Sequence, residues 1–96
     1  MKKSNDQTLK EVINELLEAY KLGDKLKEVR LIDSWEKVVG KLINKHTKNL
    51  YIKKKVLFVK LDSAALRNEL SYARQKIIKA LNKEAKEVVI DDIVFT

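Results

Sequence analysis

Lysines without acidic neighbours are the residues of this sequence best suited to a defined chemical task. The stretch from Lys37 to Leu61 holds eight lysines and no Asp or Glu, so its formal charge of +8 exceeds the +7 of the whole chain. Clustered ammonium groups attract phosphate and favour polyanionic partners. We therefore expect a nucleic-acid-binding surface built from the lysines of this stretch: Lys37, Lys41, Lys45, Lys48, Lys53, Lys54, Lys55 and Lys60.

The first four of these lysines would form one stripe on a continuous helix. At about 100° per residue, Lys37, Lys41, Lys45 and Lys48 fall within about 80° of arc, opposite an apolar side. A solvated helix face is the alternative interpretation, but such faces normally alternate lysine with glutamate four residues away. This face has no glutamate. A helix break at Gly40 would displace Lys37 from the stripe.

Aromatic residues accompany the remaining lysines on a predicted β-hairpin. Tyr51 and Phe58 share its outer face with Lys53, Lys55 and Lys60. Single-stranded nucleic acids stack their bases on such rings while nearby cations neutralise the backbone. A cross-strand aromatic pair also stabilises a hairpin by itself, and the face could instead be covered by N-terminal helices or a second subunit.

Three polar residues of a later predicted helix share another face. Arg67, Ser71 and Arg74 could extend the basic surface, whereas the nearby Glu69 favours an ordinary solvated face. Trp35 lies on the apolar side of its own helix. Core packing is the simplest role for its ring, and an anchor for a protein partner is the alternative.

The sequence gives no pattern for catalysis. His46 is the only histidine, cysteine is absent, and Asp91 and Asp92 would point to opposite faces of a strand. Phosphate-loop, dinucleotide and triad motifs are missing too. We expect a protein that is not an enzyme and holds no metal or cofactor. The absence of cysteine, of a signal peptide and of a long apolar segment predicts a cytoplasmic protein without a membrane span.

Hydrophobic periodicity predicts three helical regions. A polar, flexible tail of residues 1–7 precedes a helix that opens with a Thr8–Glu11 capping box and stops at Gly23. A second helical region runs from Asp24 to near Thr47, and its apolar side consists of Leu26, Val29, Ile32, Trp35, Val39 and Leu42. A third, capped by Asp62 or Ser63, buries Leu66, Leu70, Ala73, Ile77 and Leu81.

Alternating residues predict the strands. With Lys54 and Lys55 as the loop of a hairpin, Ile52 faces Leu57 and Tyr51 faces Phe58. The turn is unusual because a tight turn prefers glycine or asparagine. A last strand spans 88–95. The order is α-α-β-β-α-β, and we expect residues 8–96 to form a single α+β domain, a three-stranded sheet with helices packed on one face.

Short motifs in a fixed order resemble a known family. They are Trp35, Val38-Val39-Gly40, Ile43, His46-Thr47, Leu57-Val59, Ser63-Ala64-Ala65, Glu69-Leu70 and Ile93-Val94-Phe95. With these residues, the chain from Leu9 to Phe95 resembles the DciA family of bacterial helicase-loading proteins, in a short form without the C-terminal extension of longer members. The G-x-x-G loop of true KH domains is absent, because glycine occurs only at Gly23 and Gly40.

The resemblance implies a KH-like domain that binds DNA, single- or double-stranded, and assists loading or operation of the replicative helicase. In that light Trp35 becomes a candidate helicase contact and the lysines a candidate DNA contact. Two alternatives remain: a KH-like module for RNA or single-stranded nucleic acid without a helicase partner, and a scaffold that forms a homodimer through an open sheet edge.

Overall fold

Helices come first in this chain, and the strands of the sheet begin only at Thr47. The computed structural model describes residues 3–19 and 22–96. The elements are α1 (Lys3–Ala19), α2 (Leu22–Asp33), α3 (Trp35–Val39), α4 (Lys41–Lys45), β1 (Thr47–Lys53), β2 (Val56–Leu61), α5 (Ala64–Tyr72), α6 (Arg74–Ala85) and β3 (Asp92–Phe95). The α+β class and the three-stranded sheet that the sequence predicted are therefore confirmed.

The hairpin has the register expected from the alternation of its side chains. β1 and β2 are antiparallel, with Ile52 opposite Leu57 and Tyr51 opposite Phe58. The turn residues Lys54 and Lys55 have φ values of 52° and 64°. Positive φ at both central residues is what a two-residue turn between twisted strands requires. The hairpin thus closes tightly although neither residue is the usual asparagine or glycine.

The last strand is shorter than predicted because a side chain replaces part of the ladder. β3 begins at Asp92 and runs parallel to β2, giving the sheet order β1-β2-β3. Before it, the Asn82 amide accepts hydrogen bonds from the backbone N–H groups of Val89 and Ile90 and donates one to the Ile90 carbonyl, at 2.9 to 3.1 Å. These backbone groups are satisfied without strand pairing, so the segment 88–91 stays irregular.

The predicted helices are interrupted more often than their periodicity suggested. The region from Asp24 to Thr47 forms α2, α3 and α4, broken at Ser34 and at Gly40. Gly40, with a φ of 93°, confirms the expected break. Ser34 was not foreseen; its hydroxyl donates to the Leu31 carbonyl at 2.7 Å, a bond that competes with the helical pattern. The third long helix likewise divides at Ala73 into α5 and α6.

Two predicted helix boundaries near the N-terminus are wrong. α1 begins at Lys3, so Thr8 lies inside the helix instead of capping it. Residues 1 and 2 of the predicted tail lie outside the described residues. Gly23 belongs to the first turn of α2 and does not end a helix. At the start of α5 the expected cap is confirmed, because the Ser63 hydroxyl accepts the Leu66 N–H at 3.2 Å.

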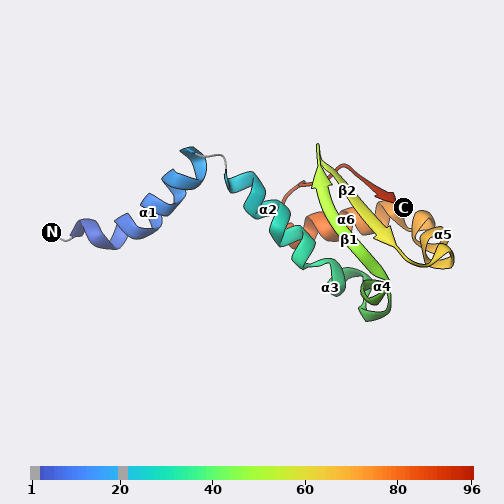
Figure 1. Ribbon diagram of the computed structural model, residues 1–96. Helices are drawn as coiled ribbons and strands as arrows, with labels where there is room; N and C mark the ends of the chain where they lie inside the picture. The colour runs from blue at the N-terminus through green and yellow to red at the C-terminus, as the bar shows by residue number, and fades with distance from the viewer. Residues whose placement is uncertain (1–2, 20–21) are drawn as a thin grey trace.

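The core lies between the helices and one face of the sheet. Its most buried side chains, each less than 2 % exposed, are Leu31, Trp35, Leu57, Val59, Leu81, Ile90 and Ile93. In Figure 1, α6 lies behind the hairpin, and α2 and α3 flank it. The predicted apolar side of the second helical region is wrong in part: Leu42 is 63 % and Val29 is 51 % exposed. The break at Gly40 puts Leu42 on a separate helix, α4, and on α2 it is Leu31 that is buried and not Val29.

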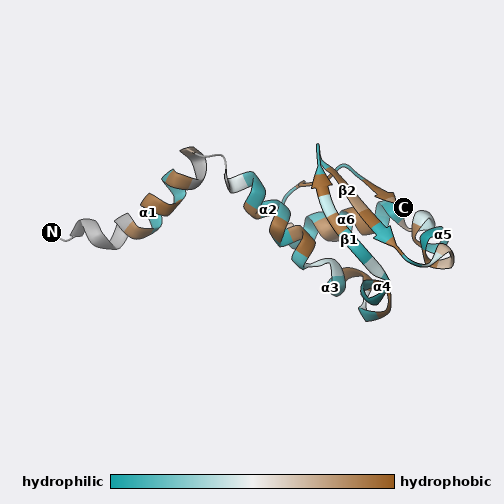
Figure 2. Cartoon of the chain, viewed as in Figure 1, coloured by the Kyte–Doolittle hydropathy of each residue, from teal (hydrophilic) through white to brown (hydrophobic). Residues whose placement is uncertain are grey.

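The first helix extends away from the sheet. The molecule measures 61 Å along its longest axis and 25 Å across, and α1 accounts for this elongation (Figure 1). Its apolar residues Leu9, Val12 and Leu16 are about half exposed or more. Figure 2 shows hydrophobic bands, in brown, along α1. None of the described helices is both long and apolar enough to cross a membrane. The outer face of the sheet keeps exposed side chains, Tyr51 and Val94 among them.

Candidate nucleic-acid interface

A row of apolar side chains crosses the outer face of the sheet. The strand register puts Tyr51 opposite Phe58, and Phe58 beside Val94 on β3. The two aromatic rings are stacked, with their centroids 4.8 Å apart and their planes 10° from parallel. Tyr51 is 47 % and Val94 is 36 % exposed. The helices pack against the opposite face of the sheet, so the Tyr51 ring, through the face that does not stack on Phe58, can serve as an aromatic platform for a base.

Lysines flank this platform on both sides. Lys53 lies two register positions beyond Tyr51, towards the turn, and Lys60 pairs with Asn49 on the other side of the row. Both lysines are exposed. Among residues 3–19 and 22–96, neither makes an ion pair. Cations beside a stacking surface can contact the phosphates on either side of a stacked base.

The predicted lysine stripe does not form as one helical face. The break at Gly40 separates Lys37 on α3 from Lys41 and Lys45 on α4. Lys48 lies on β1, at the bulge between Thr47 and Asn49. The prediction placed all four lysines on a helical region that ends near Thr47, whereas α4 ends at Lys45 and β1 already begins at Thr47. Lys41 and Lys45 remain together, one turn apart, exposed, and without an ion pair in the described part of the chain.

Acidic residues from outside the stretch reach back to three of its lysines. Lys37 Nζ lies 2.9 Å from Glu84 Oε1, Lys48 Nζ lies 3.2 Å from Asp62 Oδ2, and Lys55 Nζ lies 3.8 Å from Asp91 Oδ1. The stretch from Lys37 to Leu61 contains no acidic residue, but in the fold carboxylates from other segments lie beside three of its lysines. Five of its lysines have no such partner within the described ranges: Lys41, Lys45, Lys53, Lys54 and Lys60.

His46 has a carboxylate partner that its sequence surroundings did not indicate. It caps the C-terminus of α4, and its Nδ1 lies 2.7 Å from Asp62 Oδ1. The backbone N–H of Asp62 also donates to the His46 carbonyl at 3.0 Å. Hydrogen bonds from His46 and then from Lys48 lower the pKa of the Asp62 carboxyl below its ordinary value. The cluster fastens the end of α4 to the end of β2 and so fixes Lys41 and Lys45 beside the sheet.

Trp35 lies in the core. Its side chain is 1 % exposed, and its indole N–H donates to Thr47 Oγ1 at 3.0 Å. The Thr47 hydroxyl in turn donates to the Ile43 carbonyl at 2.7 Å. The ring therefore joins α3, α4 and β1, in agreement with the core-packing role. Contact between this ring and a partner would require α3 to move.

The two predicted arginines lie apart from the lysines. Arg67 and Arg74 line a cavity of about 350 Å³ together with residues of α5 and β3. No lysine of the stretch from Lys37 to Lys60 lines this cavity. The shared face predicted for Arg67, Ser71 and Arg74 is present, but it forms a separate hollow and does not continue the lysine surface.

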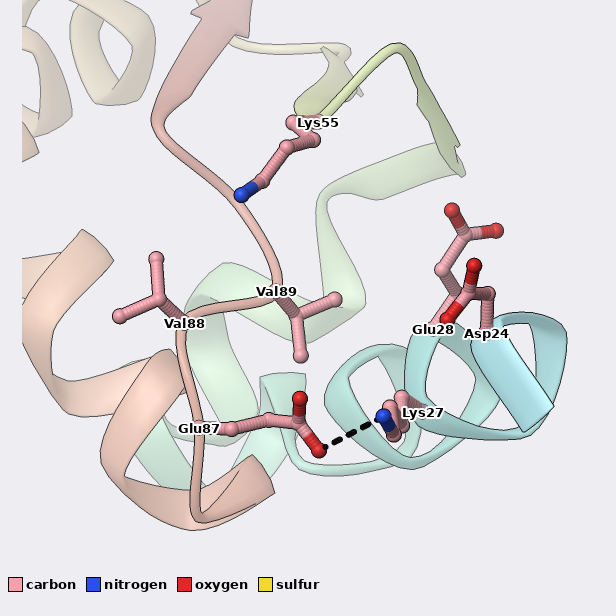
Figure 3. A pocket seen from close by; sticks show the side chains of 7 residues that line it. All are labelled: Asp24, Lys27, Glu28, Lys55, Glu87, Val88 and Val89. Carbon is pink, nitrogen blue, oxygen red and sulfur yellow. Dashed lines mark ion pairs between the residues drawn. The ribbon is translucent and has the colours of Figure 1, made fainter.

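A smaller hollow of about 210 Å³ lies at the turn end of the sheet (Figure 3). Figure 3 shows its lining side chains, Asp24, Lys27, Glu28, Lys55, Glu87, Val88 and Val89. Lys27 Nζ pairs with Glu87 Oε2 at 3.2 Å. The carboxylates that line the hollow repel phosphate. Lys55 lines this hollow of mixed charge and also pairs with Asp91. Lys55 is consequently the turn lysine least available to a nucleic acid.

Comparison with known proteins identifies the family. The family model described as "Dna[CI] antecedent, DciA" matches residues 8–95. No curated protein and no solved structure matches the chain at a significant level. Because the match spans nearly the whole sequence, the chain belongs to the DciA family, and the resemblance inferred from its motifs is confirmed.

Proposed function

From membership of the DciA family, we propose that this protein binds DNA and assists the replicative helicase, by binding and not by catalysis. The family is associated with the replicative helicase and with its loading. Within that setting, we infer a KH-like cytoplasmic domain that contacts the DNA while it engages the helicase. The observation that best supports DNA binding is the Tyr51–Phe58 stack, with Tyr51 exposed, flanked by Lys53 and Lys60, which make no ion pair with any described residue.

The proposed contact favours single-stranded DNA. A base stacked on Tyr51 must be unstacked from at least one neighbouring base, because the ring needs a free face of the base, and bases inside a duplex are stacked on both faces. Lys53 and Lys60 lie on either side of the ring and would contact successive phosphates. Lys41 and Lys45, fixed beside the sheet through the His46–Asp62 bond, would extend the path of the backbone.

The test is fluorescence anisotropy of labelled single-stranded DNA, duplex DNA and single-stranded RNA across a salt series. For single strands, each phosphate contact contributes about 0.7 to the slope of log K against log salt. The variant Lys41→Glu/Lys45→Glu should lower the slope for single-stranded DNA by about 1.4 if both lysines contact phosphate. Binding that is absent, or independent of salt, would contradict the proposal. Equal or tighter binding of RNA would favour the RNA-binding alternative.

A matched control separates this surface from general positive charge. Lys79 and Lys83 have the same four-residue spacing on α6, are exposed, and make no ion pair within the described residues. The variant Lys79→Glu/Lys83→Glu changes the net charge by the same amount. If it weakens binding as much as Lys41→Glu/Lys45→Glu does, the protein acts as a nonspecific polycation and the assigned surface is wrong.

The helicase part of the proposal requires a separate measurement. The full chain and the host's replicative helicase should co-elute in size-exclusion chromatography at low salt. The Lys41→Glu/Lys45→Glu variant should keep this association if DNA and helicase use different surfaces. Failure of the wild-type protein to co-elute would remove the helicase partner while leaving the DNA-binding test intact.

A further inference from the structure

The elbow between α5 and α6 borders an open cavity at the surface that the proposed DNA contact does not use. Its volume is about 350 Å³, and its lining residues are Ala64, Arg67, Asn68, Ser71, Arg74 and Phe95. They come from α5, the first residue of α6 and the end of β3. An adjoining hollow of about 410 Å³ shares Ser71 and Arg74 and adds Tyr72, Gln75 and Lys76. Together the two hollows offer space for a small ligand with several functional groups.

Arginine is concentrated at this place. The chain has only three arginines among its 21 basic residues, and two of them, Arg67 and Arg74, line the cavity. No acidic residue lines it. Neither arginine forms an ion pair with any described residue, whereas five lysines of the same molecule do. A guanidinium binds phosphate through two parallel hydrogen bonds, a geometry that lysine cannot offer.

Arg74 also has an unsatisfied donor. Its Nε is buried and has no hydrogen-bond partner among the residues that the structure describes. Buried polar groups without partners are rare because each one loses its hydration without compensation. An anion bound side-on by Nε and a terminal nitrogen of the guanidinium, after a small rotation of the side chain, would satisfy this donor. Arg74 is the first residue of α6, directly after the break at Ala73.

We propose that this cavity binds the phosphomonoester group of a nucleotide, with the dianion held between the guanidinium groups of Arg67 and Arg74. Ser71 and Asn68 supply further polar groups, and the 84 % exposed Tyr72 ring offers a stacking surface for the base in the adjoining hollow. The nucleotide is either free or the terminal residue of a strand. The inference shares no residue with the lysine and aromatic surface, so it does not depend on the proposed function.

The test is NMR titration of the ¹⁵N-labelled full chain with thymidine 5′-monophosphate, and with thymidine as the probe without phosphate. The monophosphate should shift the amide signals of Arg67, Ser71 and Arg74, and thymidine should not. Because Arg74 is partly buried, Arg67→Gln is the main variant, and it should weaken binding about 10- to 100-fold. The third arginine, Arg30, is exposed on α2, and Arg30→Gln is the matched control that should change nothing.

Oligonucleotides with a 5′-phosphate or a 5′-hydroxyl show whether the bound phosphate belongs to a free nucleotide or to the end of a strand. Tighter binding of the phosphorylated strand, lost in Arg67→Gln, assigns the cavity to a strand end. Binding of the mononucleotide without that preference assigns it to a free nucleotide. Equal shifts with thymidine, or no effect of Arg67→Gln, overturn the inference. Lys41→Glu/Lys45→Glu should leave the mononucleotide titration unchanged. The titration therefore tests the cavity even if the lysines prove not to bind DNA.

Discussion

Replacing the hairpin turn should make the protein more stable and its DNA binding weaker. Lys54 and Lys55 hold φ values of 52° and 64°, in the left-handed region. That conformation costs a residue with a side chain about 1 to 2 kcal/mol, whereas glycine avoids the clash but loses about 0.5 to 1 kcal/mol of chain entropy. Asparagine tolerates the region better than lysine does. The variant Lys54→Asn/Lys55→Gly should therefore gain about 1 kcal/mol, which raises Tm by about 4 to 8 °C in a domain of this size.

The binding side of this prediction follows from the neighbours of the two lysines. Lys55 already faces Asp91 at 3.8 Å, so its loss should matter little, whereas Lys54 has no ion-pair partner among the described residues. If Lys54 contacts a phosphate, the salt slope for single-stranded DNA should fall by about 0.7. Thermal unfolding and the anisotropy salt series measure the two effects on the same protein.

A charge-matched control separates conformation from charge. Lys54→Gln/Lys55→Gln removes the same two charges and keeps side chains that strain the turn. It should bind DNA as weakly as Lys54→Asn/Lys55→Gly but should not share its gain in Tm. If the two variants melt at the same temperature, the turn does not impose the positive φ values, and the reasoning from turn geometry is refuted.

Three further predictions concern the contacts around the core. Asn82→Ala should cost about 2 to 4 kcal/mol in urea unfolding, because it removes the partners of Val89 and Ile90; Asn82→Asp, which still accepts both N–H bonds, should cost less. Trp35→Ala should cost about 3 to 5 kcal/mol by the same assay. The pKa of Asp62 is lowered in the folded protein, so its carboxylate stabilises the fold fully above the ordinary pKa of 3.8 and loses this effect as the pH falls through the folded pKa. Asp62→Asn should therefore lower Tm at pH 6, and the Tm values of variant and wild type should converge in strong acid.

Local patterns predicted the sheet better than they predicted the helices. Alternation alone fixes which side of a strand faces the core, and the pairing of Tyr51 with Phe58 followed from it. Helix interruptions depend on single hydrogen bonds and on packing. The break at Gly40 was predictable because glycine is unfavourable inside a helix. The break at Ser34 was not, because a serine hydroxyl can equally stay solvated. Nothing in the sequence around Ala73 marks the division of α5 from α6. The segment before β3 was predicted as strand because its residues are apolar, and only the position of Asn82 shows otherwise.

The candidate site shows how a count of charge along the chain differs from charge in space. Glu84, Asp62 and Asp91 lie outside the lysine-rich stretch, yet the fold returns each of them to one of its lysines. These pairs are exposed, and exposed pairs contribute only about 0 to 1 kcal/mol, so a phosphate can replace the carboxylate at small cost. Repulsion between the arriving phosphates and the displaced carboxylates still opposes binding there. The lysines without acidic partners therefore define the preferred path, and Lys53 and Lys60 on the open sheet face should contribute more to affinity than Lys37 on the helical side.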